Sequence, residues 1–181
     1  MTKWTLGIIG GVVVILLLAG LGVIFGFGYV ARANYLYRVF PSESMYPTLR
    51  SGDRVLFRKL DPEQALGRGE IVLHHSSQMF GNRIIEPKDY ARRIVGLPGE
   101  KVIVRASGIV EVNDVPLERR EVGTFTFQSR HRDIDMTLYL ECVTEAVCYQ
   151  VAQHDVRTPQ AMQEAMMLGE DEYFLLGDNR D

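Results

Sequence analysis

Two serines lie two residues apart in the stretch Pro41–Leu49, directly after a long apolar segment. A serine hydroxyl is a weak nucleophile unless a nearby base takes its proton and hydrogen-bond donors stabilise the developing oxyanion. In an extended Ser-x-Ser, Ser44 would attack, while its own N–H and the Ser42 hydroxyl would both face the oxyanion. Pro47 stiffens the segment, because it fixes its own φ and restricts Tyr46. The competing interpretation is an ordinary turn, since serine and proline are frequent turn residues.

Three further stretches follow the serine pair in order along the chain. Gly52-Asp53 comes almost at once, Tyr90–Glu100 comes later, and Gly177–Asp181 ends the sequence. In this order, behind an apolar segment, the four stretches closely resemble the motifs of type I signal peptidases, membrane-bound serine proteases that remove signal peptides. The resemblance extends from the apolar segment to the last residue. It implies a membrane-anchored serine endopeptidase that acts on exported preproteins.

The resemblance assigns roles to residues on and near the serine pair. Ser44 matches the nucleophile, and Ser42 matches the hydroxyl of the oxyanion hole. Arg92 stands where the bacterial enzymes carry a lysine as general base. Tyr90, beside the base position, is implied to bind substrate. Met45, next to the nucleophile, is expected either to line the substrate pocket or to pack in the interior.

The last motif is expected to support the site. Arg93 matches a residue that family members pair with an acid, and Asp178 is the natural partner in this sequence. We interpret this pair as a structural ion pair, whatever the role of Ser44. In the family the last motif continues into closing strands and a segment with an acid and a further serine, which helps to orient the lysine. This sequence stops at Asp181, so we expect the domain to be incomplete at its C-terminal end.

Arginine at position 92 conflicts with the chemistry of a general base. A buried lysine can serve, because desolvation lowers its pKa until the neutral amine accepts the serine proton. A guanidinium stays protonated, so Arg92 can donate hydrogen bonds but cannot be the base. Lys88 lies about 13 Å away along an extended strand, which makes it a poor substitute unless the strand bulges. His74 and His75 titrate near neutrality in general, but exposed histidines at a strand end are the simpler interpretation.

Three functions stay open on these residues. The first is a signal peptidase I-like serine endopeptidase, whose substrates carry small residues at the first and third positions before the cleaved bond because the pocket is shallow. The second is an inactive relative, a membrane-tethered peptide-binding or assembly module that keeps the peptide site without the base. The third is a specialised peptidase of a conjugation or pilus system. The expected partners are signal peptides of exported preproteins and the lipid bilayer.

Length, charge and cysteine content limit the class of protein. The chain has 181 residues and a net charge of −3, so it lacks the basic character typical of nucleic-acid binding. Its length suffices for one anchor and one domain that buries a core without a cofactor or a metal. Cys142 and Cys148 are the only cysteines. We expect them to form a hairpin disulfide in an oxidising compartment, and the alternative is two unpaired small apolar side chains.

The segment Leu6–Val30 contains no charged residue. As a helix with a rise of about 1.5 Å per residue, it exceeds a hydrocarbon core of about 30 Å. A cleavable signal peptide is the alternative, but its apolar region would span only about 7 to 15 residues. We therefore expect residues 1–33 to form a cytoplasmic tail with a transmembrane anchor, and residues 34–181 to form the β domain. The resemblance implies a single pass through the bacterial inner membrane, with the amino terminus in the cytoplasm and the domain on the extracytoplasmic side.

Short β-branched runs separated by turn residues follow the anchor, which predicts a mainly antiparallel β domain with barrel or sandwich closure. The charged segment Ser129–Asp135 is expected to be a loop. One short helix is predicted at Gln160–Leu168, because Pro159 precedes it and Gly169 follows it. Strands are expected at Asp53–Leu60, Glu70–His74, Ala91–Val95, Lys101–Arg105, Ile109–Val112, Gly123–Gln128, Thr137–Val143 and Val147–Val151.

Overall fold

The computed structural model describes residues 3–61, 64–76, 79–80, 83–84, 88–128, 133–154 and 161–180. The chain divides into two compact units. One unit comprises Met1–Arg38 with Leu56–Pro62, and the other comprises Val39–Val55 with Glu63–Asp181. The serine stretch and the later motifs all belong to the second unit.

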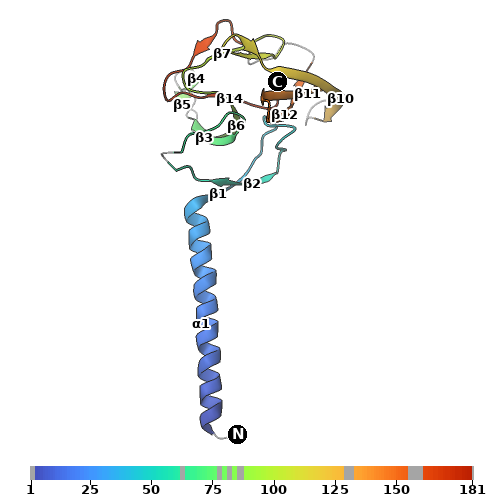
Figure 1. The fold of residues 1–181 in the computed structure, drawn as a ribbon. Helices are drawn as coiled ribbons and strands as arrows, with labels where there is room; N and C mark the ends of the chain where they lie inside the picture. The colour runs from blue at the N-terminus through green and yellow to red at the C-terminus, as the bar shows by residue number, and fades with distance from the viewer. Residues whose placement is uncertain are drawn as a thin grey trace. The chain divides into compact units, whose positions relative to one another are not determined.

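The first unit is dominated by one long helix, α1 (Lys3–Asn34), of 32 residues (Figure 1). Its segment Val13–Asn34 is long and apolar enough to cross a membrane. Side chains such as Leu16, Ile24 and Phe25 are largely exposed, which is costly in water and favourable in lipid. Arg32 lies in the last turn, where a positive charge complements the helix dipole. The helix fits the membrane anchor that the sequence predicts.

The serine pair lies on a loop between two paired strands. β1 (Tyr35–Val39) pairs with β2 (Arg54–Arg58). Two backbone hydrogen bonds extend this pairing into the loop, from Phe40 N to Asp53 O at 3.1 Å and from Gly52 N to Phe40 O at 2.7 Å. These bonds hold the two ends of the loop together, so the intervening residues are presented as one turn.

The second unit consists of short sheets. The strand pairs whose register the structure gives are antiparallel, which confirms the mainly antiparallel β prediction, whereas barrel or sandwich closure stays a prediction. The sheet that carries Arg92 has the order β14-β6-β3. The strands of this sheet, in that order, are β14 (Phe174–Leu176), β6 (Lys88–Gly96) and β3 (Ile71–Ser76). A second sheet has the order β13 (Met166–Met167), β7 (Lys101–Val104), β8 (Val110–Val112) and β9 (Val115–Pro116), and a third has the order β10 (Glu118–Gln128), β11 (Asp133–Thr144) and β12 (Val147–His154). β4 (Met79–Phe80) pairs with β5 (Arg83–Ile84).

The apolar core joins three of these sheets. Its members come from β6, β7, β8, β11, β12 and β14, with one residue after β13. Valine predominates, as expected for strands buried by packing against other sheets. The core residues are Val95, Val102, Val104, Val110, Val112, Val143, Tyr149, Val151, Leu168 and Leu176.

The short helix predicted at Gln160–Leu168 is wrong for the part that can be assessed. Gln160 lies outside the described residues, and Ala161–Leu168 contains no helix. Met166 and Met167 instead form β13 and pair with β7, and Leu168 N donates to Glu100 O at 2.9 Å. The edge of β7 that does not pair with β8 offers backbone hydrogen-bond partners to this segment. Pairing with a distant strand therefore overrides the local helix signal.

The loop predicted at Ser129–Asp135 is also only partly correct. Residues 129–132 lie outside the described residues, but Asp133–Asp135 belong to β11 and pair with Thr126–Gln128 of β10. Their acidic side chains are on the exposed side, and Thr126 Oγ1 donates to Asp135 Oδ1 at 2.9 Å. The charged side chains of Asp133 and Asp135 therefore lie on a solvent-exposed end of a strand and not on a loop.

Candidate active site

The site is built on the alternation of side chains along β6. Tyr90 and Arg92 are half-buried, whereas Ala91 and Arg93 are buried, because successive strand residues point to opposite faces. The neighbouring strand β3 sets Val72 opposite Arg92 and His74 opposite Tyr90. One face of β6 therefore presents Arg92 between aromatic and apolar neighbours, and the other directs Arg93 into the interior.

Ser44 and Arg92 are in direct contact. Arg92 Nη1 donates to Ser44 Oγ at 2.7 Å and to the Ala91 carbonyl at 2.7 Å. The guanidinium carbon lies 5.5 Å from the centre of the Tyr90 ring, within range of a cation–π contact. Burial lowers the pKa of Arg92 from its usual value, and Tyr90 opposes this shift. The side chain remains a cation at neutral pH, so it donates to Ser44 and cannot take its proton.

Ser42 contacts the backbone of the nucleophile candidate. Ser44 N donates to Ser42 Oγ at 3.2 Å. The amide proton is thus directed at the Ser42 oxygen, while the Ser42 hydroxyl proton remains available to an acceptor. Ser42 is exposed and Ser44 is half-buried. The prediction of an extended Ser-x-Ser is wrong, because a turn begins at Ser44 and its N–H is directed at Ser42 Oγ and not at an oxyanion.

Met45 and Tyr90 occupy different environments, although both are predicted substrate contacts. Met45 is 1% exposed, which favours the packing role over the pocket role. Tyr90 is half-buried and stacks on His74 with ring centres 5.7 Å apart. Of the two, Tyr90 is the side chain that lies beside Arg92.

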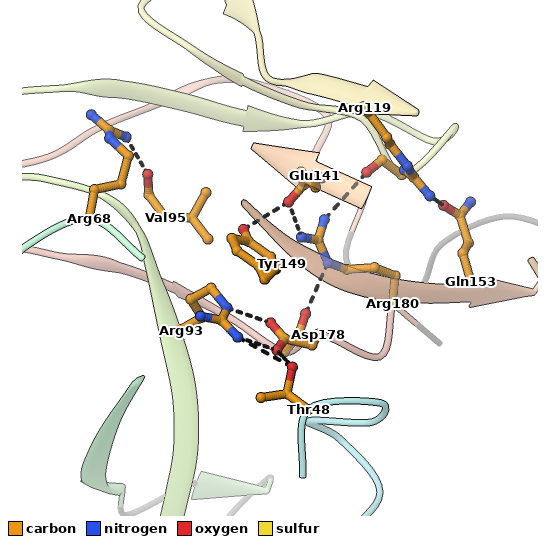
Figure 2. Close-up of polar contacts among 12 residues, drawn as sticks. Thr48, Arg68, Arg93, Val95, Arg119, Glu141, Tyr149, Gln153, Asp178 and Arg180 are labelled. Carbon is orange, nitrogen blue, oxygen red and sulfur yellow. Dashed lines mark hydrogen bonds and ion pairs between the residues drawn. The ribbon is translucent and has the colours of Figure 1, made fainter. Parts of the chain in front are cut away.

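Arg93 and Asp178 form a buried, bidentate ion pair (Figure 2). Arg93 Nε donates to Asp178 Oδ1 at 2.8 Å, and Arg93 Nη2 donates to Asp178 Oδ2 at 2.6 Å. Arg93 Nη1 also donates to the Gly69 carbonyl at 2.7 Å, and Thr48 Oγ1 donates to Asp178 Oδ2 at 2.5 Å. The guanidinium carbon lies 3.9 Å from the centre of the Tyr149 ring. Such a geometry satisfies both charges in the interior.

A second buried pair lies beside the first. Arg180 Nη2 donates to Glu141 Oε1 at 2.5 Å, and the Tyr149 hydroxyl donates to the same oxygen at 2.9 Å. Figure 2 shows Tyr149 between the two pairs. Burial, and next the charge of Glu141, raise the pKa of Tyr149 above its usual range. Its proton therefore stays on the hydroxyl, where it serves as a donor to Glu141.

The segment Gly177–Asn179 packs against the loop that carries Ser42 and Ser44. Asn179 N donates to the Ser44 carbonyl at 3.2 Å, and Asn179 Nδ2 donates to the Glu43 carbonyl at 3.3 Å. A Cβ on Gly177 would lie 2.4 Å from the Ser44 carbonyl oxygen, a separation that only glycine permits. The close approach fixes the backbone of Ser44 against the last motif.

A family model described as "Signal peptidase, peptidase S26" matches residues 8–181. The chain belongs to the signal peptidase family. Similar proteins include a protein named signal peptidase I from Leptolyngbya laminosa, 34% identical over 57% of this chain and 51% of that protein. A probable signal peptidase I-2 from Synechocystis is 35% identical over 52% of this chain and 41% of that protein. A signal peptidase I from Rickettsia canadensis is 29% identical over 63% of this chain and 42% of that protein.

This signal peptidase family chain spans about half the length, or less, of these curated relatives. The structure brings Ser42, Ser44, Tyr90 and Arg92 together on one side of β6 and Arg93 with Asp178 on the other. Their catalytic and substrate-binding roles stay predictions.

Cys142 and Cys148 form a disulfide, with sulfurs 2.03 Å apart, between β11 and β12. Among the described residues no group of three or more His, Cys, Asp or Glu side chains is placed to hold a metal.

Lys88, His74 and His75 are the remaining candidates for a general base. The β3–β6 register runs without a shift from Lys88 to Arg93, so no bulge brings Lys88 closer to Ser44. His75 is exposed and contacts Asp89, with Nδ1 and Oδ1 2.9 Å apart. His74 departs from the expectation of an exposed histidine, because it is half-buried beside Arg92. Burial, and next the positive charge of Arg92, lower the pKa of His74, which keeps it neutral at pH 7.

Sequence reasoning missed several residues that support the site. Thr48, Glu141, Tyr149 and Arg180 all belong to the buried charge pairs. Nothing in a strand sequence marks a buried carboxylate such as Glu141. The one available signal was Arg180, which follows Asp178 by two residues in the last motif.

Proposed function

We propose that this protein is a membrane-anchored, signal peptidase I-like serine endopeptidase that acts on the signal peptides of exported preproteins. Ser44 is the nucleophile, the Ser42 hydroxyl stabilises the oxyanion, and Tyr90 contacts the substrate. The observation that carries this proposal is the 2.7 Å contact between Ser44 Oγ and the side chain at the family's base position. It supports Ser44 as the nucleophile and position 92 as the place of the base, because nucleophile and base must lie within hydrogen-bond reach.

The same contact defines what this form lacks. For Ser44 Oγ to attack a carbonyl carbon, its proton must pass to a lone pair, and a guanidinium has none to offer. A neutral lysine amine would accept that proton and then return it to the leaving amine. We therefore propose that Arg92 leaves peptide recognition intact and makes cleavage slow. A second candidate function, a membrane-tethered peptide-binding module without turnover, follows directly if cleavage is absent.

The test is cleavage of a preprotein with an Ala-x-Ala site by the full chain in detergent. We expect Arg92→Lys to cleave about 100-fold faster than the wild type or more, since a positioned base contributes about 10² to 10⁴. Ser44→Ala in the Arg92→Lys background is the matched control and should abolish cleavage. Each variant is made with and without the C-terminal segment of the Leptolyngbya laminosa relative.

Two results would contradict the proposal in different ways. If folded Arg92→Lys gives no product even with the added segment, Ser44 is not a nucleophile and the binding module is favoured. If the wild type already cleaves as fast as Arg92→Lys, and Ser44→Ala abolishes this, then the base is not at position 92.

We propose in addition that α1 is a single-pass anchor in the bacterial plasma membrane, with the amino terminus in the cytoplasm and the β domain on the extracytoplasmic side. The exposed apolar length of α1 supports the anchor, and family membership supports the orientation. Protease treatment of spheroplasts tests it. Digestion of the β domain from outside is expected, and protection of that domain until lysis would reverse the orientation.

A further inference from the structure

We infer that Ser42, Ser44 and Arg92 bind the C-terminal carboxylate of a peptide. The inference rests on the proposed function, because it takes the peptide site at Ser44 as given. It goes further by naming the group recognised there. The ligand is a peptide that ends at the point where an intact substrate would continue, so it carries a carboxylate in place of the peptide bond.

The charge of Arg92 is the first reason. The guanidinium is half-buried, and among the described residues it makes no ion pair with an acidic side chain. Its hydrogen-bond acceptors there are one hydroxyl and one carbonyl, both neutral. Partial burial of a cation without an anion costs some free energy, because only its exposed part stays hydrated. An anionic ligand at Arg92 would remove that cost.

The inventory of hydrogen-bond donors is the second reason. Ser44 Oγ accepts from Arg92, and Ser42 Oγ accepts from the Ser44 amide, so both hydroxyl protons point elsewhere. Arg92 Nη1 is engaged, while Nε and Nη2 meet no acceptor within the part of the chain that the structure describes. Two hydroxyls and a guanidinium thus lie next to one another, each with donors that meet no acceptor among the described residues. A carboxylate, with two oxygens in one plane, matches that set.

The surroundings favour a peptide terminus over a free ion. The Tyr90 ring lies 5.5 Å from the guanidinium carbon, and His74 stacks on Tyr90. These rings offer apolar contact for the residue that carries the carboxylate, which a small ion cannot use. His74 is neutral at pH 7, because burial and then Arg92 lower its pKa, so it adds no competing charge. Arg92 thereby supplies the cation for the terminus, and the rings supply contact for its side chain.

The experiment compares two peptides that differ only at the terminus. A fluorescent decapeptide ending in Ala-Leu-Ala is made as the free acid and as the amide, and anisotropy gives the Kd of each for the full chain in detergent. We expect the acid to bind about 10-fold more tightly or better, the range of a hydrogen bond to a charged group. Arg92→Gln should reduce the ratio to below about 2-fold, because it removes the cation.

Arg105→Gln is the matched control, because Arg105 is exposed and pairs with Glu111. It removes one positive charge away from Ser44 and should leave the acid-to-amide ratio unchanged. Thermal unfolding of every variant verifies that it is folded. If Arg105→Gln lowers the ratio as much as Arg92→Gln does, the preference reflects general charge and the inference is wrong.

The remaining outcomes separate this inference from the proposed function. Equal binding of acid and amide to the wild type overturns the carboxylate site and leaves peptide recognition standing. Displacement of the acid by acetate at concentrations near the peptide Kd overturns the choice of a peptide terminus. If neither peptide binds but Arg92→Lys cleaves preprotein, only the inference fails. If neither peptide binds and Arg92→Lys is inactive, both fail.

Discussion

Arg92 and Arg93 are neighbours on β6, and their environments differ completely. Arg93 is buried and donates to a carboxylate, a carbonyl and a hydroxyl. Arg92 is half-buried and donates only to Ser44 and to its neighbouring carbonyl among the described residues. The two side chains share a strand and a chemical type. What separates them is the face of the strand and the set of partners on that face.

The difference shows how a fold distinguishes structural from functional charge. A fully buried cation persists only with matched partners, so the Arg93 pocket is completed by the chain itself. A half-buried cation can be left with open donors, because solvent or a ligand completes it. The guanidinium of Arg92, with its open donors, contacts Ser44, which is the predicted nucleophile.

The largest effect should come from breaking the buried pair. Arg93→Met leaves Asp178 without its cation in the interior, and we expect a loss of about 3 to 5 kcal/mol in the free energy of unfolding. Arg92→Met is the matched variant, one residue away, and should cost about 1 kcal/mol or less. Thermal unfolding of the full chain, followed by circular dichroism, measures both. Equal losses would show that Arg92 is also structural and would end the contrast.

A smaller effect is expected where the two regions join, at Gly177. Gly177→Ala puts a Cβ 2.4 Å from the Ser44 carbonyl oxygen, so the serine loop must shift, at a cost of about 1 to 3 kcal/mol. Cleavage by the Arg92→Lys enzyme should fall along with the Tm. Gly67→Ala is the control, since its Cβ would meet only the Glu70 side chain at 3.6 Å. Unchanged cleavage by Gly177→Ala would mean that this close approach does not position Ser44.

Tyr149→Phe tests the buried network with one atom. The change removes the hydroxyl that donates to Glu141 and leaves Arg180 as a donor to the same oxygen. We expect a loss of about 1 to 2 kcal/mol, the usual cost of a buried acceptor losing one donor. Peptide binding at Ser44 should not change, because Tyr149 contacts Arg93, whose side chain lies on the opposite face of β6 from Arg92. A change in binding without a change in Tm would contradict this division of roles.

The smallest effect concerns pH and His74. Its pKa is lowered in the fold, by burial first and by Arg92 next, so the folded state binds fewer protons than the unfolded state below about pH 6.5. The His74 contribution is thus present above that pH and is lost as pH falls through the lowered pKa. Between pH 7 and pH 5 the wild-type Tm should fall more than that of His74→Gln. Parallel falls would show that the fold does not lower the pKa of His74; His75→Gln serves as the control.

Local patterns predicted most of the architecture. The uncharged segment Leu6–Val30 predicted α1, and β-branched runs predicted most of the strands to within a few residues. Predictions failed where a distant partner decided the local structure. Met166 and Met167 form a strand because the edge of β7 lies beside them, and Asp133–Asp135 extend β11 because β10 continues opposite. Neither neighbour can be read from the segment itself.

For the site, the residue types alone settled which groups are present: two hydroxyls, a permanent cation at the base position, and an arginine with an acid to pair with it. That follows because acidity and hydrogen-bonding capacity belong to the side chain. Which acceptors each group meets was settled only by packing. Ser44 meets Arg92 across 48 positions, and Glu141 meets Arg180 across 39, because β pairing joins segments that are remote along the chain. Burial then divides two adjacent arginines into one that completes the fold and one left open to a ligand.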